Sequence, residues 1–156
     1  MSESKQMLFA RNLICICVED NKDADYQGLI YHPFSDDPVE FDGISDLVLE
    51  MEKLYDEWDF PQKGLADRKF LKHAAAEYKK NPGGDDRLPI EIIQENNGVR
   101  NVQNKKGKLG TFVVQVAFRQ NATWQGHVIY QEKNEKKDFK SELELIKYID
   151  AALGGK

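Results

Sequence analysis

Residues 112–131 alternate between apolar and polar positions in the manner of a β-hairpin. A period of two places neighbouring side chains on opposite faces of a strand. The apolar positions of the first run are Phe112, Val114, Val116 and Phe118. A polar turn at 120–122 follows, and a second alternating run spans 123–131. The pattern predicts two antiparallel strands joined by a tight turn.

Beyond this hairpin the pattern changes to helical spacing. Residues 132–138 are polar and predict a loop, after which Phe139 is expected to close over the core. Ser141 with Glu144 fits the capping box that opens a helix. Apolar residues then recur at helical spacing: Leu145, Ile146, Ile149 and Leu153. The segment predicts a helix that ends at Gly154-Gly155.

The first part of the chain repeats this pattern 98 residues earlier. The shift superimposes Ala24-Asp25-Tyr26-Gln27-Gly28 on Ala122-Thr123-Trp124-Gln125-Gly126. Six positions between 14 and 55 are identical at this shift, and the apolar character of the surrounding positions also agrees. The first copy predicts strands at 13–19 and 26–33 and a helix over 44–58. The apolar stripe of that helix is Leu47, Met51, Leu54 and Trp58.

An insertion, about 59–110, separates the two copies. It predicts a helix over 67–80 that stops at Asn81-Pro82-Gly83-Gly84, and a short strand at 88–94. Residues 95–110 are rich in Asn, Lys and Gly and predict a mobile loop.

The repeat predicts a single α+β domain over 1–156. A hairpin with one helix cannot bury its apolar face alone. Two ββα repeats, about 12–58 and 111–153, are therefore expected to share one antiparallel sheet of at least four strands. A pseudo-twofold axis would relate them, with both repeat helices on one face of the sheet.

The second copy also carries a family resemblance. Arg119-Gln120-Asn121-Ala122-Thr123-Trp124-Gln125-Gly126 is followed by Phe139-Lys140-Ser141-Glu142-Leu143-Glu144-Leu145-Ile146. This strand-turn-strand-helix pattern, over about 112–153, resembles a group of short bacterial proteins that have no established activity. The resemblance implies that single-copy relatives pair as homodimers and that this chain is a fused version of such a dimer.

Composition places the chain among intracellular proteins. Of its 156 residues 40% are hydrophobic and 31% charged, and no apolar run approaches the ~20 residues that span a bilayer. No secretion signal is visible, and the two cysteines, Cys15 and Cys17, stand too close on one strand to bridge each other. We therefore expect a reduced, cytoplasmic protein that does not cross a membrane.

Charge is distributed unevenly along the chain. Residues 1–60 hold four basic and fifteen acidic residues, a net charge of −11, whereas 61–156 hold eighteen and twelve, a net charge of +6. A basic stripe without acids runs from 97 to 120: Arg100, Lys105, Lys106, Lys108 and Arg119. The asymmetry indicates either an anionic partner or attraction between the two halves.

Two aromatic residues at equivalent places in the copies complete the candidate binding site. Tyr26 and Trp124, with the neighbouring Gln125, could stack a base of single-stranded nucleic acid while the cations contact phosphate. The alternative is structural, because a strand glycine lets a large ring lie across it and the glutamine can bond to the turn backbone.

No catalytic or metal constellation is evident. The histidines, His32, His73 and His127, have no carboxylate or nucleophile at a suitable spacing on the same element, and the cysteine pair lacks further ligands. We expect no catalytic residue, no metal and no cofactor. The leading hypothesis is a non-enzymatic interaction module that binds protein or self-associates. Single-stranded nucleic-acid binding is the alternative, and an enzyme with a pocket beside the inserted helix comes third.

Overall fold

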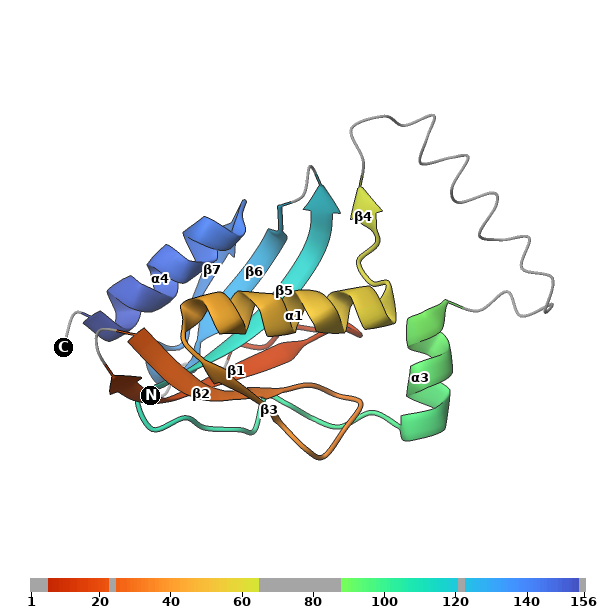
Figure 1. The fold of residues 1–156 in the computed structure, drawn as a ribbon, viewed down its shortest axis with the longest axis horizontal. Coiled ribbons are helices and arrows are strands. Elements are labelled where there is room, and N and C mark those ends of the chain that lie inside the picture. Colours follow the sequence, from red (N-terminus) through yellow and green to blue (C-terminus); the bar gives the residue numbers. More distant parts are fainter. Residues whose placement is uncertain (1–5, 23–24, 65–87, 121–122, 155–156) are drawn as a thin grey trace.

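The protein is built on a sheet of six antiparallel strands in the order β3-β2-β1-β5-β6-β7 (Figure 1). The computed structural model describes residues 6–22, 25–64, 88–120 and 123–154. Helices α1 and α4 lie on one face of the sheet, and α3 stands beside one end of α1. The expected α+β class with an antiparallel sheet is confirmed.

The first half of the fold comprises three strands and a helix. They are β1 (Ile14–Lys22), β2 (Asp25–Tyr31), β3 (Val39–Asp42) and α1 (Ile44–Trp58). The predicted helix over 44–58 is confirmed, and its predicted apolar stripe is buried together with Tyr55. Strand β3 was not predicted, because four residues after a proline-rich loop are too few to show a period of two. It forms by pairing its backbone with β2.

The second half has the same order of elements. They are β5 (Gly110–Gln120), β6 (Gln125–Tyr130), the 3₁₀ turn η1 (Gln131–Lys133), β7 (Glu135–Phe139) and α4 (Glu142–Gly154). The prediction of a loop at 132–138 is wrong. The four charged residues that begin β7 are all exposed at the sheet edge, so no apolar alternation marks the strand.

The described parts of the insertion differ from the prediction. Strand β4 (Lys63–Gly64) pairs in parallel with the end of β5, and 88–94 is not a strand but the start of helix α3 (Pro89–Asn97). Proline at the first helical position is favourable, since its missing N–H would have no intrahelical partner there. The predicted helix over 67–80 lies outside the described residues. Across the described ranges, no helix combines the length and apolar character that a membrane span needs.

Residues 98–109, most of the predicted loop over 95–110, form neither a helix nor a strand, and part of the segment packs on the sheet. Val102 and Gln103 are buried there. The N–H of Leu109 donates to the carbonyl oxygen of Val18 (2.8 Å). The burial of Val102 and this backbone bond to β1 therefore help to hold a segment whose composition is that of a loop.

The two faces of the sheet bury separate apolar clusters. The larger lies between the sheet and its helices and includes most of the predicted core positions of both halves, but Phe118, which follows the bulge in β5, is 58% exposed. The smaller lies on the opposite face, under the segments 6–13 and 98–109. Its buried members are Leu8, Leu13, Cys15, Cys17, Val102, Val113 and Ile129.

Strands β1 and β5 each contain a β-bulge next to a glycine of the neighbouring strand. The bulges follow Val18 and Val116, which pair with Gly28 and Gly126 respectively. A Cβ on either glycine would overlap a backbone carbonyl oxygen of the bulged strand. Both bulges therefore require glycine opposite them.

Candidate functional site

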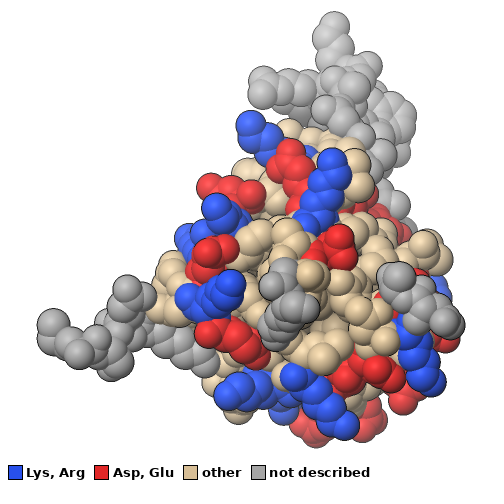
Figure 2. Space-filling view, turned by 90° about the vertical axis from the view of Figure 1, so that its left-hand side faces the viewer, with Lys and Arg blue, Asp and Glu red and all other residues tan. Residues whose placement is uncertain are grey.

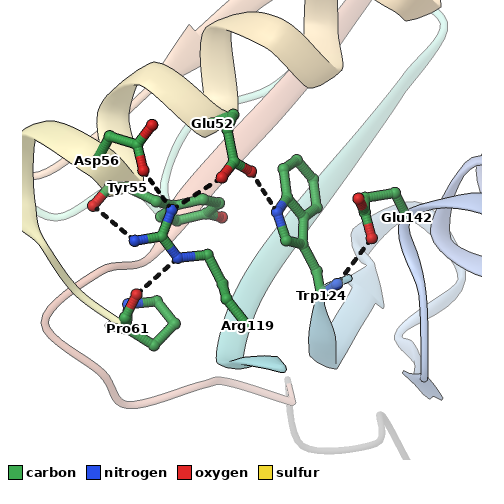
Figure 3. A network of polar contacts seen from close by, with 7 residues as sticks. All are labelled: Glu52, Tyr55, Asp56, Pro61, Arg119, Trp124 and Glu142. Carbon is green, nitrogen blue, oxygen red and sulfur yellow. Dashed lines mark hydrogen bonds and ion pairs between the residues drawn. The ribbon is translucent and has the colours of Figure 1, made fainter. Parts of the chain in front are cut away.

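Arg119, one of the predicted binding cations, is buried at the end of β5 and joins that strand to α1 (Figure 3). Only 2% of its side chain is exposed. Its Nη1 donates to the carboxylates of Glu52 (2.9 Å) and Asp56 (2.8 Å). Its Nε donates to the carbonyl oxygen of Pro61 (2.6 Å), and its Nη2 to that of Tyr55 (3.3 Å). Arg119 thus uses its guanidinium for contacts within the protein.

The two predicted aromatic residues are also buried, Trp124 with 1% and Tyr26 with 6% of its surface exposed. The indole Nε1 of Trp124 donates to Glu52 of α1 (2.6 Å), and the hydroxyl of Tyr26 donates to Asp150 of α4 (2.8 Å). Burial and the Asp150 carboxylate raise the pKa of Tyr26 to about 12. Each ring is bonded to the helix of the other half and offers no face to a ligand.

Gln125 holds the turn between β5 and β6. Its Nε2 donates to Thr123 Oγ1 (2.6 Å), to the carbonyl oxygen of Lys140 (3.3 Å) and to that of Gln120 (3.5 Å). Gln125 therefore bonds to backbone as the structural alternative expects, whereas Tyr26 and Trp124 are held by helix carboxylates.

The hydroxyl of Tyr55 is buried near this network and, among the described residues, has no hydrogen-bond partner. Burial raises its pKa. We expect Tyr55→Phe to raise the free energy of unfolding by about 1–3 kcal/mol, because the cost of burying a hydroxyl disappears. The ring contacts with Trp58 (5.9 Å) and Trp124 (5.5 Å) remain.

Urea unfolding followed by tryptophan fluorescence measures this change. Tyr26→Phe is the matched control and should lose about 0.5–1.5 kcal/mol, because its hydroxyl is hydrogen-bonded. A loss of stability in Tyr55→Phe would show that an ordered water satisfies the hydroxyl.

The remaining predicted cations belong to the segment 98–109, on the face of the sheet opposite α1 and α4. The guanidinium of Arg100 pairs with Asp36 (Nε to Oδ1, 2.7 Å), and the ammonium of Lys105 lies 4.9 Å from the centre of the Tyr31 ring. Lys106 and Lys108 are exposed. The structure thus separates the four cations from the predicted aromatic pair.

Two adjacent pockets follow this segment and share Asn104 and Lys105. The smaller, which we call the end pocket, has a volume of about 300 Å³. Its lining comprises Tyr31, His32, Ser35, Asp36, Arg100, Asn101, Val102, Asn104 and Lys105. The larger, which we call the η1 pocket, has a volume of about 700 Å³. Its lining comprises Gln103, Asn104, Lys105, Lys106, Gln131, Glu132, Lys133 and Asn134. Together they form what we call the Lys105 groove.

The groove carries an excess of positive charge. Among the described residues, its lining contains four basic side chains, Arg100, Lys105, Lys106 and Lys133, and two acidic ones, Asp36 and Glu132. Glu132 accepts two hydrogen bonds from Thr111, from its N–H and its hydroxyl (both 2.8 Å). The Glu132 carboxylate is therefore held against Thr111.

The separation of charge along the sequence does not give every surface of the fold a single sign of charge. On the side that faces left in Figure 1, basic and acidic side chains alternate, and neither sign gathers into a patch (Figure 2). The cations of the Lys105 groove thus form a local group on a surface that elsewhere mixes both signs.

Metal-ligating types do not converge in the described parts of the chain. Cys15 and Cys17 are buried with their sulfur atoms 3.9 Å apart, and no group of three His, Cys, Asp or Glu side chains gathers among the described residues. His127 contacts Asp138 across β6 and β7 (Nδ1 to Oδ1, 2.6 Å). Spacing within one element could not reveal this pair, since β7 was not predicted.

Sequence reasoning also missed half of the groove. Arg100, Lys105 and Lys106 were predicted binding residues, but the lining from His32 to Asp36 and from Gln131 to Asn134 was not. The basic stripe was the one usable signal.

The family models, curated proteins and solved structures compared with this chain show no match.

Proposed function

We propose that this protein is a non-enzymatic binding module that holds an acidic segment of a partner protein in the Lys105 groove. The observation that supports it is the composition of the groove: its described lining holds four cations against two carboxylates. Cations attract the carboxylates of an acidic segment, and the side-chain amide of Asn104 can donate to and accept from its peptide groups.

The groove fits an extended peptide better than single-stranded nucleic acid. Binding of single strands relies on aromatic faces on which successive bases stack. The described lining holds two aromatic rings: the ammonium of Lys105 lies over the ring of Tyr31, and the ring of His32 packs edge-on against Trp58. Tyr26 and Trp124 are buried elsewhere. Phosphate attraction would remain, but base stacking would not.

We further propose that the scaffold is a fused pair of related units, each now βββα and not ββα. Equivalent positions support this. Trp124 bonds to Glu52 and Tyr26 to Asp150, and both pairs correspond at a shift of 98 residues. The same shift relates two further hydrogen bonds. The N–H of Asp42 donates to the carboxylate of Asp46, and the N–H of Lys140 donates to that of Glu144. Such a pair would place the acidic first half against the basic second half within one chain.

Charge reversal in the groove tests the binding proposal. We expect a fluorescein-labelled, glutamate-rich ten-residue peptide to bind the full chain at 50 mM salt. Lys105→Glu combined with Lys106→Glu should weaken the binding about tenfold or more, since two favourable charge contacts become repulsive. Fluorescence anisotropy measures both affinities.

The matched control is Lys140→Glu combined with Lys147→Glu, which makes the same charge change at exposed positions on the side of α4. It should bind the peptide nearly as the native chain does. No peptide binding, or equal loss in both double variants, would contradict the proposal. Tighter binding of a fifteen-residue oligothymidine that only the Lys105 and Lys106 variant loses would favour nucleic acid instead.

A further inference from the structure

The end pocket presents more hydrogen-bond donors than acceptors. Its donors come from Arg100, Lys105, His32, Ser35, Asn101 and Asn104. Asp36 is the one acidic side chain in its described lining. Two full positive charges and several neutral donors around one small cavity favour an anion with several oxygen atoms.

Two of these side chains use their acceptor atoms in local hydrogen bonds, so their donor atoms remain for a ligand. The side-chain oxygen of Asn101 accepts the N–H of Gln103 (2.9 Å), so its amide nitrogen is the atom that remains for a ligand. The hydroxyl oxygen of Ser35 accepts the N–H of Asp37 (3.1 Å), which leaves its O–H to donate. Both side chains are therefore arranged to give hydrogen bonds.

His32 is arranged in the same sense. Its Nδ1 accepts the N–H of Phe34 (3.3 Å), so the proton of the neutral ring resides on Nε2. The ring packs against Trp58 at a centroid distance of 5.6 Å. Burial and the charge of Arg100 lower the pKa of His32, which keeps the ring neutral at pH 7. It thus supplies an oriented N–H donor.

The guanidinium of Arg100 is held at the mouth of the pocket. Its backbone N–H donates to the carbonyl oxygen of Pro33 (2.8 Å), and its Nη1 donates to that of Asn97 (2.8 Å). Nε pairs with Asp36, whose side chain is 84% exposed. In the described part of the chain, Nη2 has no partner. A ligand anion can therefore take Nη2 directly and compete with Asp36 for Nε.

Resting on the function proposed above, we infer that the end pocket binds a phosphate monoester, carried on a phosphorylated side chain of the acidic segment. Such a group bears about −1.5 to −2 charges at pH 7 and three acceptor oxygens. It matches the two cations and the surrounding donors, whereas a carboxylate has one charge and two oxygens and leaves donors unpaired. A volume of about 300 Å³ accommodates the group and its side chain.

Titration with matched peptides tests the inference. The probes are an eight-residue glutamate-rich peptide with one phosphoserine, the same peptide with serine, and inorganic phosphate, each added to the full chain at pH 7.5. The phosphopeptide should bind about tenfold or more tightly than the serine peptide. Arg100→Gln should remove that difference. Asp36→Asn should increase it severalfold, because the competing carboxylate is gone.

Arg11→Gln is the control, since Arg11 is an arginine paired with Glu91 outside the groove. It should bind all probes as the native chain does. A gain of affinity in Asp36→Asn cannot result from misfolding, so this variant keeps the test decisive if Arg100→Gln is unstable.

The outcomes separate the two proposals. Equal binding of both peptides would overturn the phosphate site and leave the acidic-segment function standing. Inorganic phosphate that binds as tightly as the phosphopeptide would assign the pocket to free phosphate and overturn the peptide source. If neither peptide binds, the proposed function fails, and with it the peptide-borne phosphate.

Discussion

Alanine in place of Gly126 or of Gly28 is expected to lower the free energy of unfolding by about 3–5 kcal/mol. A Cβ on Gly126 would overlap the carbonyl oxygen of Gln115, and one on Gly28 would overlap that of Cys17. Cys17 pairs with strands on both of its sides, and Gln115 pairs with His127 of β6. Relief of the overlap therefore requires the bulge to open and break ladder hydrogen bonds.

Urea unfolding monitored by circular dichroism measures both variants. Gly154→Ala is the matched control, because a Cβ there meets no atom within 4 Å, and it should leave stability unchanged or slightly raised. Similar losses in the two strand variants would support equivalence of the two halves. A loss below about 1 kcal/mol in either would show that its bulge yields easily.

The second large effect is expected for Arg119→Met, a loss of about 2–4 kcal/mol. Removal of the guanidinium takes a hydrogen bond from the buried carbonyl oxygen of Pro61 and an ion pair from each of the neighbouring carboxylates of Glu52 and Asp56. The two carboxylates are 31% and 46% exposed, so water offsets part of the cost.

A second substitution distinguishes a loss of charge balance from a loss of packing in Arg119→Met. Adding Asp56→Asn to Arg119→Met should recover part of the stability, because the repulsion between two carboxylates disappears. The same urea titration measures it. Arg11→Gln, at an exposed ion pair, should change stability by about 0.5 kcal/mol or less. Native-like stability of Arg119→Met would contradict a structural role for the buried arginine.

Strong periodicity made part of the fold predictable. Helix α1 follows from an apolar stripe that recurs over four turns, and the strands β1, β2, β5 and β6 follow from largely apolar residues at every second position, although β1 and β5 bury both faces over much of their length. At the start of α4, the N–H of Glu144 donates to Ser141 Oγ (3.2 Å), as the capping box requires. In each case a local pattern and the tertiary structure demand the same side chains.

Elements that depend on distant backbone partners escaped prediction. Strand β7 presents charged residues to solvent and gains its hydrogen bonds from β6, while α3 buries only Ile90 among its residues. The binding prediction failed in part for the same reason. In the sequence, Arg119 is one more cation of a basic stripe. In the structure it is buried against α1, where it contacts Glu52 and Asp56, more than sixty positions earlier in the chain.

The sequence by itself determined the two hairpin-and-helix patterns, the glycines opposite the bulges and the place of the basic stripe, because these properties reside in nearest neighbours along the chain. Only the tertiary structure decided which cations face solvent. It turned Arg119 inward to carboxylates of α1, and it brought Arg100 and Lys105 beside His32, which lies in a different half of the chain. Burial and partner choice depend on distances across the sheet, and no local pattern records them.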